Sequence, residues 1–336
     1  MKKLVKAVSA VLLVMVLSQA VTAAENSLEI DPAMNFMPGS RIAVVSKNTK
    51  GEFWEQVRSG MEEAVKEIND TFSLTGNDKI YMTFEGPGDE KEVESQINTL
   101  DAVIAENPDV LCLCAGDMNS CQAQIEAATE NGIPTVVFDS YVTDMSLVSA
   151  YRSTDNRKVG TIAAEKMAEA LKEKGKLIVF SAQEKTSTVR DRVDGFESKM
   201  KEFPDIEVIE VIYDDQVEDM AGAMEEAFAN DPEIDGVYCT NDEISNVYLE
   251  LPESEDRQCV FIGTDASKKQ QEAIRSGKEL GCVSQNPREM GFQTILAAVQ
   301  LTGVDGNGTV EEESLIEPMW IDSTSIASPE AADYLY

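Results

Sequence analysis

The residues best suited to chemistry in this sequence are polar side chains that follow short apolar segments. Asp139 and Asp265 come directly after apolar runs, and Asn241 and Gln285 follow or closely follow two more. Carboxylates, amides and a guanidinium such as that of Arg192 can each make paired hydrogen bonds in a fixed geometry. Such a set is suited to holding the hydroxyl groups of a small polyhydroxylated molecule.

Two adjacent aromatic residues, Phe53 and Trp54, support the same interpretation, because a flat apolar ring can stack on the C–H face of a sugar. They open a segment with helical periodicity at residues 52–68. We therefore expect one ring to belong to the helix core and the other to face the ligand. Gln183 and Asp215 also follow strand-like segments and complete the set of candidate binding residues.

Several of these residues have purely structural explanations as well. Asp139 and Asp265 could cap the helices that follow them, and Asn241 could close a turn. Arg190 and Arg192 are two positions apart on an expected helix, so they face different directions and only one should face the strand ends. The placement of the whole set after strands nevertheless favours a ligand site.

Catalysis has little support in this composition. The chain contains no histidine, which removes the commonest general base and a common zinc ligand. Asp139 and Asp265 facing each other would resemble the carboxylate pair of a glycosidase, but that chemistry needs one acid with a raised pKa in an apolar setting. These acids are expected among hydrogen-bonding partners instead, so we expect a binding protein and not a carbohydrate-active enzyme.

The six cysteines predict neither a metal site nor a disulfide framework. Five lie in or beside apolar strand-like segments, and none belongs to paired C-x-x-C knuckles. We expect buried free thiols, with Cys239 and Cys259 as the first candidates for a bridge if one forms. A glycine and acidic loop at residues 304–313 lacks the pattern of a calcium loop, so no metal and no cofactor are expected.

Residues 1–24 have the three-part layout of a cleaved signal peptide. Three lysines precede an apolar run at residues 10–17, and small residues follow at positions 22–24. We therefore expect a periplasmic or extracellular protein. No cysteine lies at the cleavage position, so a lipid anchor is not expected.

The chain is strongly acidic. It has 62 acidic and 28 basic residues, and loss of three leader lysines changes the net charge from −34 to −37. Such a charge repels phosphate backbones and anionic lipid. Nucleic acid and membrane surfaces are therefore not expected as partners.

The elements that must position the candidate residues alternate regularly. Strands are expected at residues 41–46, 80–84, 110–115, 135–138, 149–154, 177–181, 207–213, 236–240, 260–264, 281–284 and 318–322. Helices are expected at residues 52–68, 90–106, 120–131, 159–171, 186–201, 218–229, after 241, 268–276 and 290–301. Near-continuously apolar strands separated by helices predict an α/β protein with two similar doubly wound parallel-sheet (Rossmann-like) lobes. Ligands of such sheets bind at the carboxyl ends of the strands.

Several motifs of this chain together resemble the periplasmic sugar-binding proteins of the ribose and galactose type, relatives of the effector domains of LacI-type regulators. The motifs are Glu52-Phe-Trp54, residues 132–140, residues 154–156, residues 186–192, residues 240–243, residues 262–265 and Ser284-Gln285. They extend over residues 41–322, which is nearly all of the sequence after the leader.

This resemblance implies a type I periplasmic binding protein, with two lobes joined by three hinge crossings near residues 154–156, 285–286 and 318–321. The N-terminal lobe would comprise residues 40–155 and 287–318, and the C-terminal lobe residues 156–286 and 319–336.

The resemblance also implies roles for the candidate residues. The aromatic pair should stack on a sugar, and the residues that should bind its hydroxyls are Asp139, Arg192, Asn241, Asp265 and Gln285. Ribose binders have a hydrophobic residue where this chain has Gln183 and a phenylalanine where it has Asp215. The site is therefore expected to be more polar than a ribose site.

The function implied is that of a monomeric, secreted solute-binding protein that captures a neutral sugar or polyol and delivers it to an ABC permease. The alternative is a subunit that presents the closed form to a membrane sensor kinase or chemoreceptor, because both roles use the same clamp. A DNA-binding regulator is not expected, since no helix-turn-helix pattern precedes residue 41.

Overall fold

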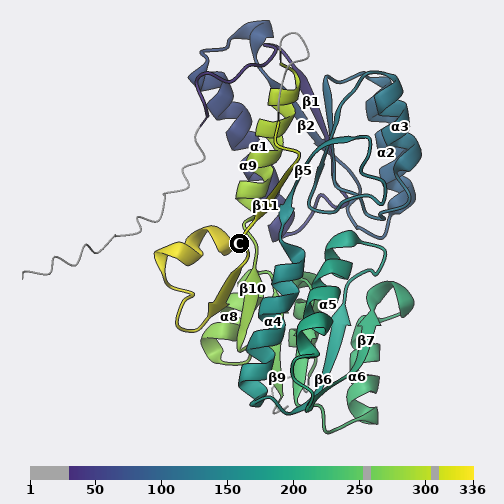
Figure 1. Ribbon diagram of the computed structural model, residues 1–336, viewed down its shortest axis with the longest axis vertical. Coiled ribbons are helices and arrows are strands. Elements are labelled where there is room, and N and C mark those ends of the chain that lie inside the picture. The colour runs from purple at the N-terminus through teal and green to yellow at the C-terminus, as the bar shows by residue number, and fades with distance from the viewer. Residues whose placement is uncertain (1–29, 253–258, 304–309) are drawn as a thin grey trace, which may run out of the picture.

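The computed structural model describes residues 30–252, 259–303 and 310–336, which form two α/β lobes stacked end to end (Figure 1). The expected signal peptide, residues 1–24, lies outside the described residues. In the described part of the chain, no helix is both long and apolar enough to cross a membrane. The last residue, Tyr336, lies between the lobes (Figure 1).

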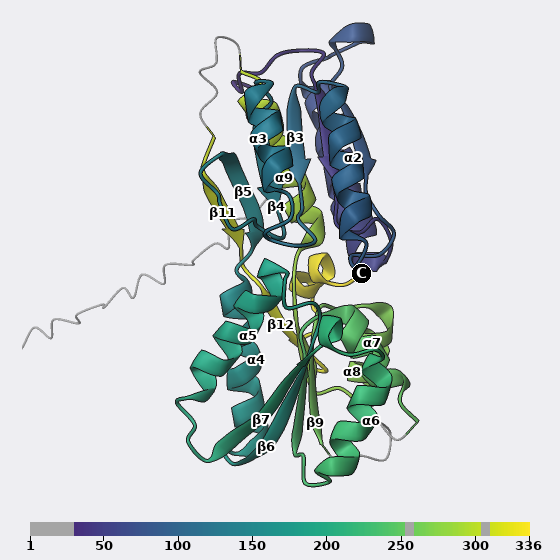
Figure 2. The same ribbon diagram turned by 90° about the vertical axis from the view of Figure 1, so that its right-hand side faces the viewer.

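The N-terminal lobe contains a six-stranded sheet in which all neighbouring strands are parallel. Its order is β11 (Glu313–Ile316), β5 (Val148–Thr154), β4 (Thr135–Phe138), β3 (Val110–Leu113), β1 (Arg41–Val45) and β2 (Tyr81–Glu85). One face is covered by α1 (Glu52–Thr71) and α9 (Pro287–Leu301), and the other by α2 (Val93–Ala105) and α3 (Gln122–Glu130) (Figure 2). Every residue of β3 and β4 is buried, as central strands of a parallel sheet require.

The C-terminal lobe repeats this plan. Its sheet has the order β12 (Met319–Asp322), β10 (Gly281–Ser284), β9 (Val260–Thr264), β8 (Gly236–Cys239), β6 (Gly175–Ser181) and β7 (Ile206–Tyr213). Only the edge strand β12 is antiparallel to its neighbour within this sheet. The helices are α4 (Asn156–Leu171) and α5 (Ser187–Met200) on one face and α6 (Met220–Asn230) and α7 (Asp242–Glu250) on the other. Helix α8 (Lys268–Ser276) and the 3₁₀ helix η4 (Pro329–Tyr334) pack beside β10 and β12.

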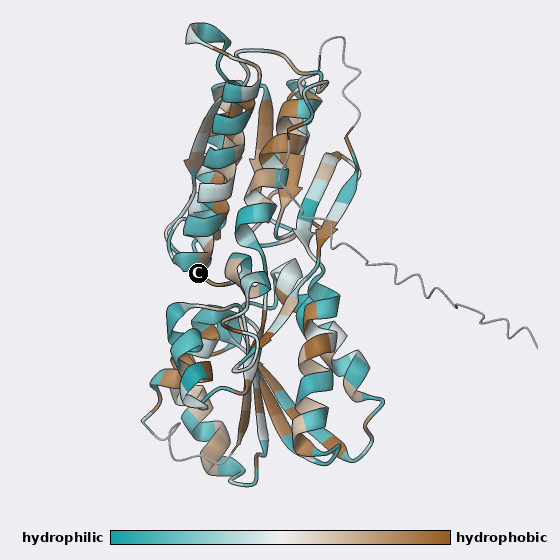
Figure 3. Cartoon of the chain, turned by 90° about the vertical axis from the view of Figure 1, so that its left-hand side faces the viewer, coloured by the Kyte–Doolittle hydropathy of each residue, from teal (hydrophilic) through white to brown (hydrophobic). Residues whose placement is uncertain are grey.

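Figure 3 shows apolar strands and inner helix faces enclosed by hydrophilic outer helix faces in both lobes. In each lobe one helix pair packs at backbone contact through glycine. A Cβ added at Gly60 of α1 would lie 1.9 Å from the carbonyl oxygen of Arg288 in α9. Gly160 of α4 has the same relation to Arg192 of α5. These contacts fix α1 against α9 and α4 against α5, and two of these helices, α1 and α5, carry residues of the candidate binding site.

Three connections join the lobes. Strand β5 leads into α4 at Asp155, β10 leads into α9 through Gln285 and Asn286, and β11 leads into β12. The side chains of Asp155 and Asn286 cap the helices that follow these crossings. The expected fold class, two doubly wound lobes with three crossings, is confirmed. The domain boundaries given above stay a prediction.

Strand β11 (Glu313–Ile316) was not expected, because its sequence is partly acidic and exposed, as an edge strand allows. Helices α4 and α9 begin three residues earlier than predicted, at the capped crossings. The expected loop at residues 304–313 falls partly outside the described residues.

The cysteine prediction is confirmed for five side chains, which are buried free thiols: Cys112, Cys114, Cys121, Cys239 and Cys282. Burial raises the pKa of Cys121 to about 12, so this thiol is unreactive at neutral pH. Cys259 is half-buried, contacts Tyr248 Oη at 3.0 Å and forms no disulfide with Cys239.

Candidate functional site

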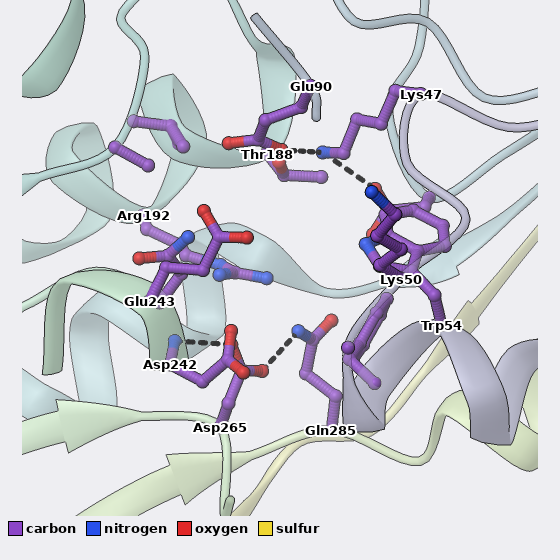
Figure 4. Close-up of a pocket in the computed structure, with 16 residues that line it drawn as sticks. Lys47, Lys50, Trp54, Glu90, Thr188, Arg192, Asp242, Glu243, Asp265 and Gln285 are labelled. Carbon is purple, nitrogen blue, oxygen red and sulfur yellow. Dashed lines mark hydrogen bonds and ion pairs between the residues drawn. The ribbon is translucent and has the colours of Figure 1, made fainter. Parts of the chain in front are cut away.

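A pocket lies between the lobes at the carboxyl ends of both sheets (Figure 4). Seven of the nine predicted binding residues line it: Phe53, Trp54, Asp139, Arg192, Asn241, Asp265 and Gln285. The other polar side chains that line it were not predicted: Lys47, Lys50, Glu90, Thr188, Asp242 and Glu243.

Asp139 and Asp265 occupy equivalent places, one after β4 and the other after β9. Both have left-handed backbone conformations, with φ of 53° and 74°. Such conformations are strained for residues other than glycine and cluster at functional sites. Neither residue caps the helix that follows it, since Ser267 caps α8 and no helix directly follows Asp139. The capping alternative is therefore wrong for both.

Asp139 is held by a buried lysine that sequence reasoning missed. Lys47 follows β1, and its Nζ lies 3.1 Å from Asp139 Oδ2 and 2.8 Å from Ser140 Oγ. Burial would raise the pKa of Asp139, but the charges of Lys47 and Arg192 outweigh it and hold the pKa below its ordinary value. Asp139 is therefore an anion at neutral pH and an acceptor for a ligand donor.

Asp265 is fixed from three directions. Its Oδ1 accepts hydrogen bonds from Gln285 Nε2 at 2.6 Å and from Tyr336 Oη at 2.8 Å. Its Oδ2 accepts from the backbone N–H of Asp242 at 3.0 Å. Tyr336 was not among the predicted residues, because it is 71 positions from Asp265 and no motif marks it.

Arg192, and not Arg190, faces the strand ends. Its Nε donates to Asn156 Oδ1 at 2.8 Å, and its Nη1 donates to the carbonyl of Thr240 at 2.7 Å. The guanidinium thus ties the first hinge crossing to the end of β8 while it lines the pocket. Asn241 has two roles as well, since its Oδ1 caps α7 by accepting from the N–H of Ile244.

Both aromatic residues belong to the buried core of the N-terminal lobe and both line the pocket, so the expected division into one core ring and one ligand-facing ring is not observed. Their rings meet edge to face, with centroids 5.0 Å apart and an interplanar angle of 83°. Phe53 also meets the ring of Tyr336 at 5.9 Å. Both side chains are 7% exposed, because the first turn of α1 lies at the boundary between core and pocket.

Gln183 and Asp215 do not line the pocket. Gln183 is fully buried, and neither polar atom of its side chain has a partner in the described part of the chain. Asp215 lies in the exposed turn after β7, where it accepts from the N–H of Glu184 at 3.0 Å. Strand β7 is the outer strand of its sheet, so its end lies away from the crevice.

The unpredicted carboxylates change the charge of the site. Burial, followed by the charge of Glu90, raises the pKa of Glu243 to about 7. Burial and the charges of Asp265 and Glu243 raise the pKa of Asp242 well above its ordinary value. Both acids directly follow Asn241, so the sequence shows all three polar residues together, but only Asn241 was predicted to bind the ligand. No cluster of His, Cys, Asp or Glu in the described residues has the arrangement of a metal site.

The lobes contact each other directly around the pocket. Tyr141 N–H donates to Ser187 Oγ at 2.8 Å, and Lys91 pairs with Asp214 at 2.6 Å. The backbone N–H of Lys268 donates to Glu52 at 3.0 Å, and the lysine ammonium pairs with the same carboxylate. The structure therefore has its two lobes in contact over the pocket.

A family model described as the periplasmic binding protein domain matches residues 42–306. The chain belongs to this family. Among its curated relatives, the ribose import binding protein of Bacillus subtilis is 24% identical over 60% of this chain. That match spans 66% of the relative, slightly less than two thirds of its length.

Two solved structures show the same fold as this periplasmic binding protein. An ABC transporter solute-binding protein from Agrobacterium vitis, bound with α-D-tagatopyranose, is 23% identical with a TM-score of 0.80, and the match covers 88% of this chain and 99% of that one. An ABC transporter, LacI family transcriptional regulator from Brachyspira murdochii is 29% identical with a TM-score of 0.75, covering 88% and 98%. Membership of the periplasmic binding protein family confirms the expectation of a binding protein.

Proposed function

We propose that this protein is an exported monomer that captures a single sugar or sugar-like polyol in the interlobe pocket and delivers it to an ABC permease. The observation that carries the proposal is the pairing of an aromatic wall, Phe53 and Trp54, with hydrogen-bonding groups from the opposite lobe. Asp265 and Gln285 face that wall from the C-terminal lobe (Figure 4). Aromatic faces hold the C–H side of a sugar, and the polar groups hold its hydroxyls.

The binding mechanism follows from the division of these groups between lobes. Ligand groups are satisfied fully only when both lobes contact them, so the ligand binds the closed form more tightly than the open form. The contacts between Tyr141 and Ser187 and between Lys91 and Asp214 form only when the lobes meet. Closure then creates the surface that the permease recognises.

The experiment is a thermal-shift screen over pentoses, hexoses, polyols and their amino derivatives, followed by calorimetry on every hit. A ligand at about 100 times its dissociation constant should add roughly 2.7 kcal/mol of stability. Small-angle scattering should show a smaller radius of gyration with the ligand than without it. If no member of the panel raises the melting temperature, the proposal is wrong.

Two glutamines provide a matched pair of variants. Gln285→Leu removes an amide that lines the pocket, and a lost hydrogen bond of about 0.5–1.5 kcal/mol predicts roughly two- to twelvefold weaker binding. Gln183→Leu removes a buried amide that does not line it, and affinity should stay within twofold. Equal effects of the two changes on affinity would contradict this assignment of the pocket.

A further inference from the structure

The pocket has an excess of acidic side chains. Five carboxylates line it, from Glu90, Asp139, Asp242, Glu243 and Asp265, against three cations, from Lys47, Lys50 and Arg192. Lys47 pairs with Asp139, and Arg192 donates to Asn156 and Thr240 while its charge also acts on Asp139. In the described chain Lys50 forms no ion pair with a carboxylate of the pocket. The cations therefore do not neutralise the remaining acids.

The unneutralised acids come from opposite lobes. Asp242 and Glu243 begin α7, and no lysine or arginine in the described chain lies within ion-pair distance of either carboxylate. Glu90, from the loop before α2, has only a long contact of 3.7 Å to Lys47 Nζ. A helix start favours nearby anions, which explains acids at the start of α7 but not the acid that faces them from the other lobe.

A second observation points to a donor-rich ligand. Gln285 is 1% exposed, and its Nε2 is fixed on Asp265, so its Oε1 is turned to the pocket and has no donor in the described chain (Figure 4). A buried acceptor without a donor costs about 1–3 kcal/mol, which a ligand donor would recover. The unsatisfied groups that face the pocket are thus acceptors.

We propose that the ligand carries a protonated amine: an amino sugar or amino polyol whose ammonium lies between Glu90 and the pair Asp242 and Glu243. This inference rests on the proposed function and narrows its substrate class. An ammonium has three donors and no acceptor, whereas a hydroxyl adds an acceptor to a site that already has an excess of them. Like charges that face each other across the lobes oppose closure, and a bound cation removes that opposition.

The raised pKa of Glu243, caused by burial and by Glu90, is the response expected of a carboxylate without its cation. An ammonium at this place would lower it. The aromatic wall remains available to the sugar ring, because Trp54 lies on the other side of the pocket (Figure 4) and Phe53, the residue before it, also lines the pocket.

The test uses matched ligands on the full-length mature protein, measured by calorimetry at pH 7.5. Glucose is compared with glucosamine and N-acetylglucosamine, galactose with galactosamine and N-acetylgalactosamine, and each polyol hit with its amino form. We expect at least one amine to bind tenfold or more tightly than its hydroxyl parent and its acetylated form.

The location of the ammonium beside Asp242 and Glu243 is tested with two double variants. Asp242→Asn with Glu243→Gln should reduce the preference for the amine to less than threefold. Glu225→Gln with Glu226→Gln removes the same two charges from the exposed face of α6 and should leave the preference unchanged.

Three outcomes would overturn the inference. Hydroxyl parents that bind as tightly as every amine would refute the substrate class while leaving the proposed function intact. An amine preference that survives the pocket double variant, or falls equally in the control, would refute the location. Failure of all sugars, neutral and amino, would instead refute the proposed function itself.

Discussion

Replacement of Lys47 by methionine should strongly destabilise the N-terminal lobe, because it leaves Asp139 as a buried anion. The Lys47 side chain is 7% exposed and that of Asp139 is 4% exposed, with 3.1 Å between the charged atoms. Removing one partner of such a pair costs about 3–5 kcal/mol. Asp139 retains a hydrogen bond from Ser140 Oγ at 2.9 Å, so we expect the lower end, about 3 kcal/mol.

The assay is urea unfolding of the ligand-free protein, with the slope compared between variants to check two-state behaviour. Asp139→Asn alone should cost a similar amount because it leaves the buried Lys47 ammonium with only the 3.7 Å contact to Glu90. The double variant should cost little more than either single change, which corresponds to a coupling energy of at least about 2 kcal/mol. Lys66→Met is the control, since Lys66 pairs with Asp70 on the surface at 74% and 69% exposure, and its cost should be below about 0.5 kcal/mol.

A result below about 1 kcal/mol for Lys47→Met would refute this reasoning. It would mean that the lysine and the carboxylate are hydrated in the ligand-free protein. Additive single and double changes would mean that the two charges do not interact.

Three further predictions concern the pocket and one concerns the thiols. Tyr336→Phe removes one donor to Asp265, and a charged hydrogen bond of about 1.5–3 kcal/mol predicts at least tenfold weaker sugar binding in calorimetry; an unchanged affinity would show that Gln285 and the Asp242 N–H hold this carboxylate without Tyr336. Trp54→Leu keeps an apolar side chain but loses the flat face, so binding should weaken roughly two- to tenfold and the ligand-induced fluorescence change should shrink; equal affinity would assign Trp54 to the core. The pKa of Glu243 is raised in the folded protein, so the folded state binds more protons and stability falls as pH rises from about 4.5 to about 7; Glu243→Gln should flatten that slope in urea unfolding at stepped pH, and an identical slope would contradict it. Thiol titration of the unfolded, unreduced protein should find at least five reactive groups, and a smaller number would reveal a disulfide.

The amino-acid sequence by itself determined the two-lobed parallel architecture. Buried parallel strands are near-continuous apolar runs, so β9 (Val260–Thr264) and β10 (Gly281–Ser284) have the predicted bounds. Because parallel strands end at one edge, residues after those strands could be placed in one crevice, and Asp139, Asp265 and Gln285 do line it. The rule worked because it depends on local pattern and topology alone.

Only the tertiary structure decided which polar residues reach the pocket. Asp215 satisfied the same strand-end rule, but its strand is the outer one, and strand order is a property of the assembled sheet. Ala182 lines the pocket and the next residue, Gln183, does not, because the path of the turn after β6 decides which side chain faces the pocket.

Lys47 and Tyr336 show why the other residues of the site could not be predicted from the sequence. A single lysine in a sequence is expected to be a solvated surface charge. The burial of Lys47 depends on Asp139, 92 positions away, whose negative charge balances the cost of desolvating the ammonium. Tyr336 reaches Asp265 only because η4 returns the end of the chain to the space between the lobes. Local pattern predicts where strands end, whereas the partners that neutralise a buried charge come from segments that only folding brings together.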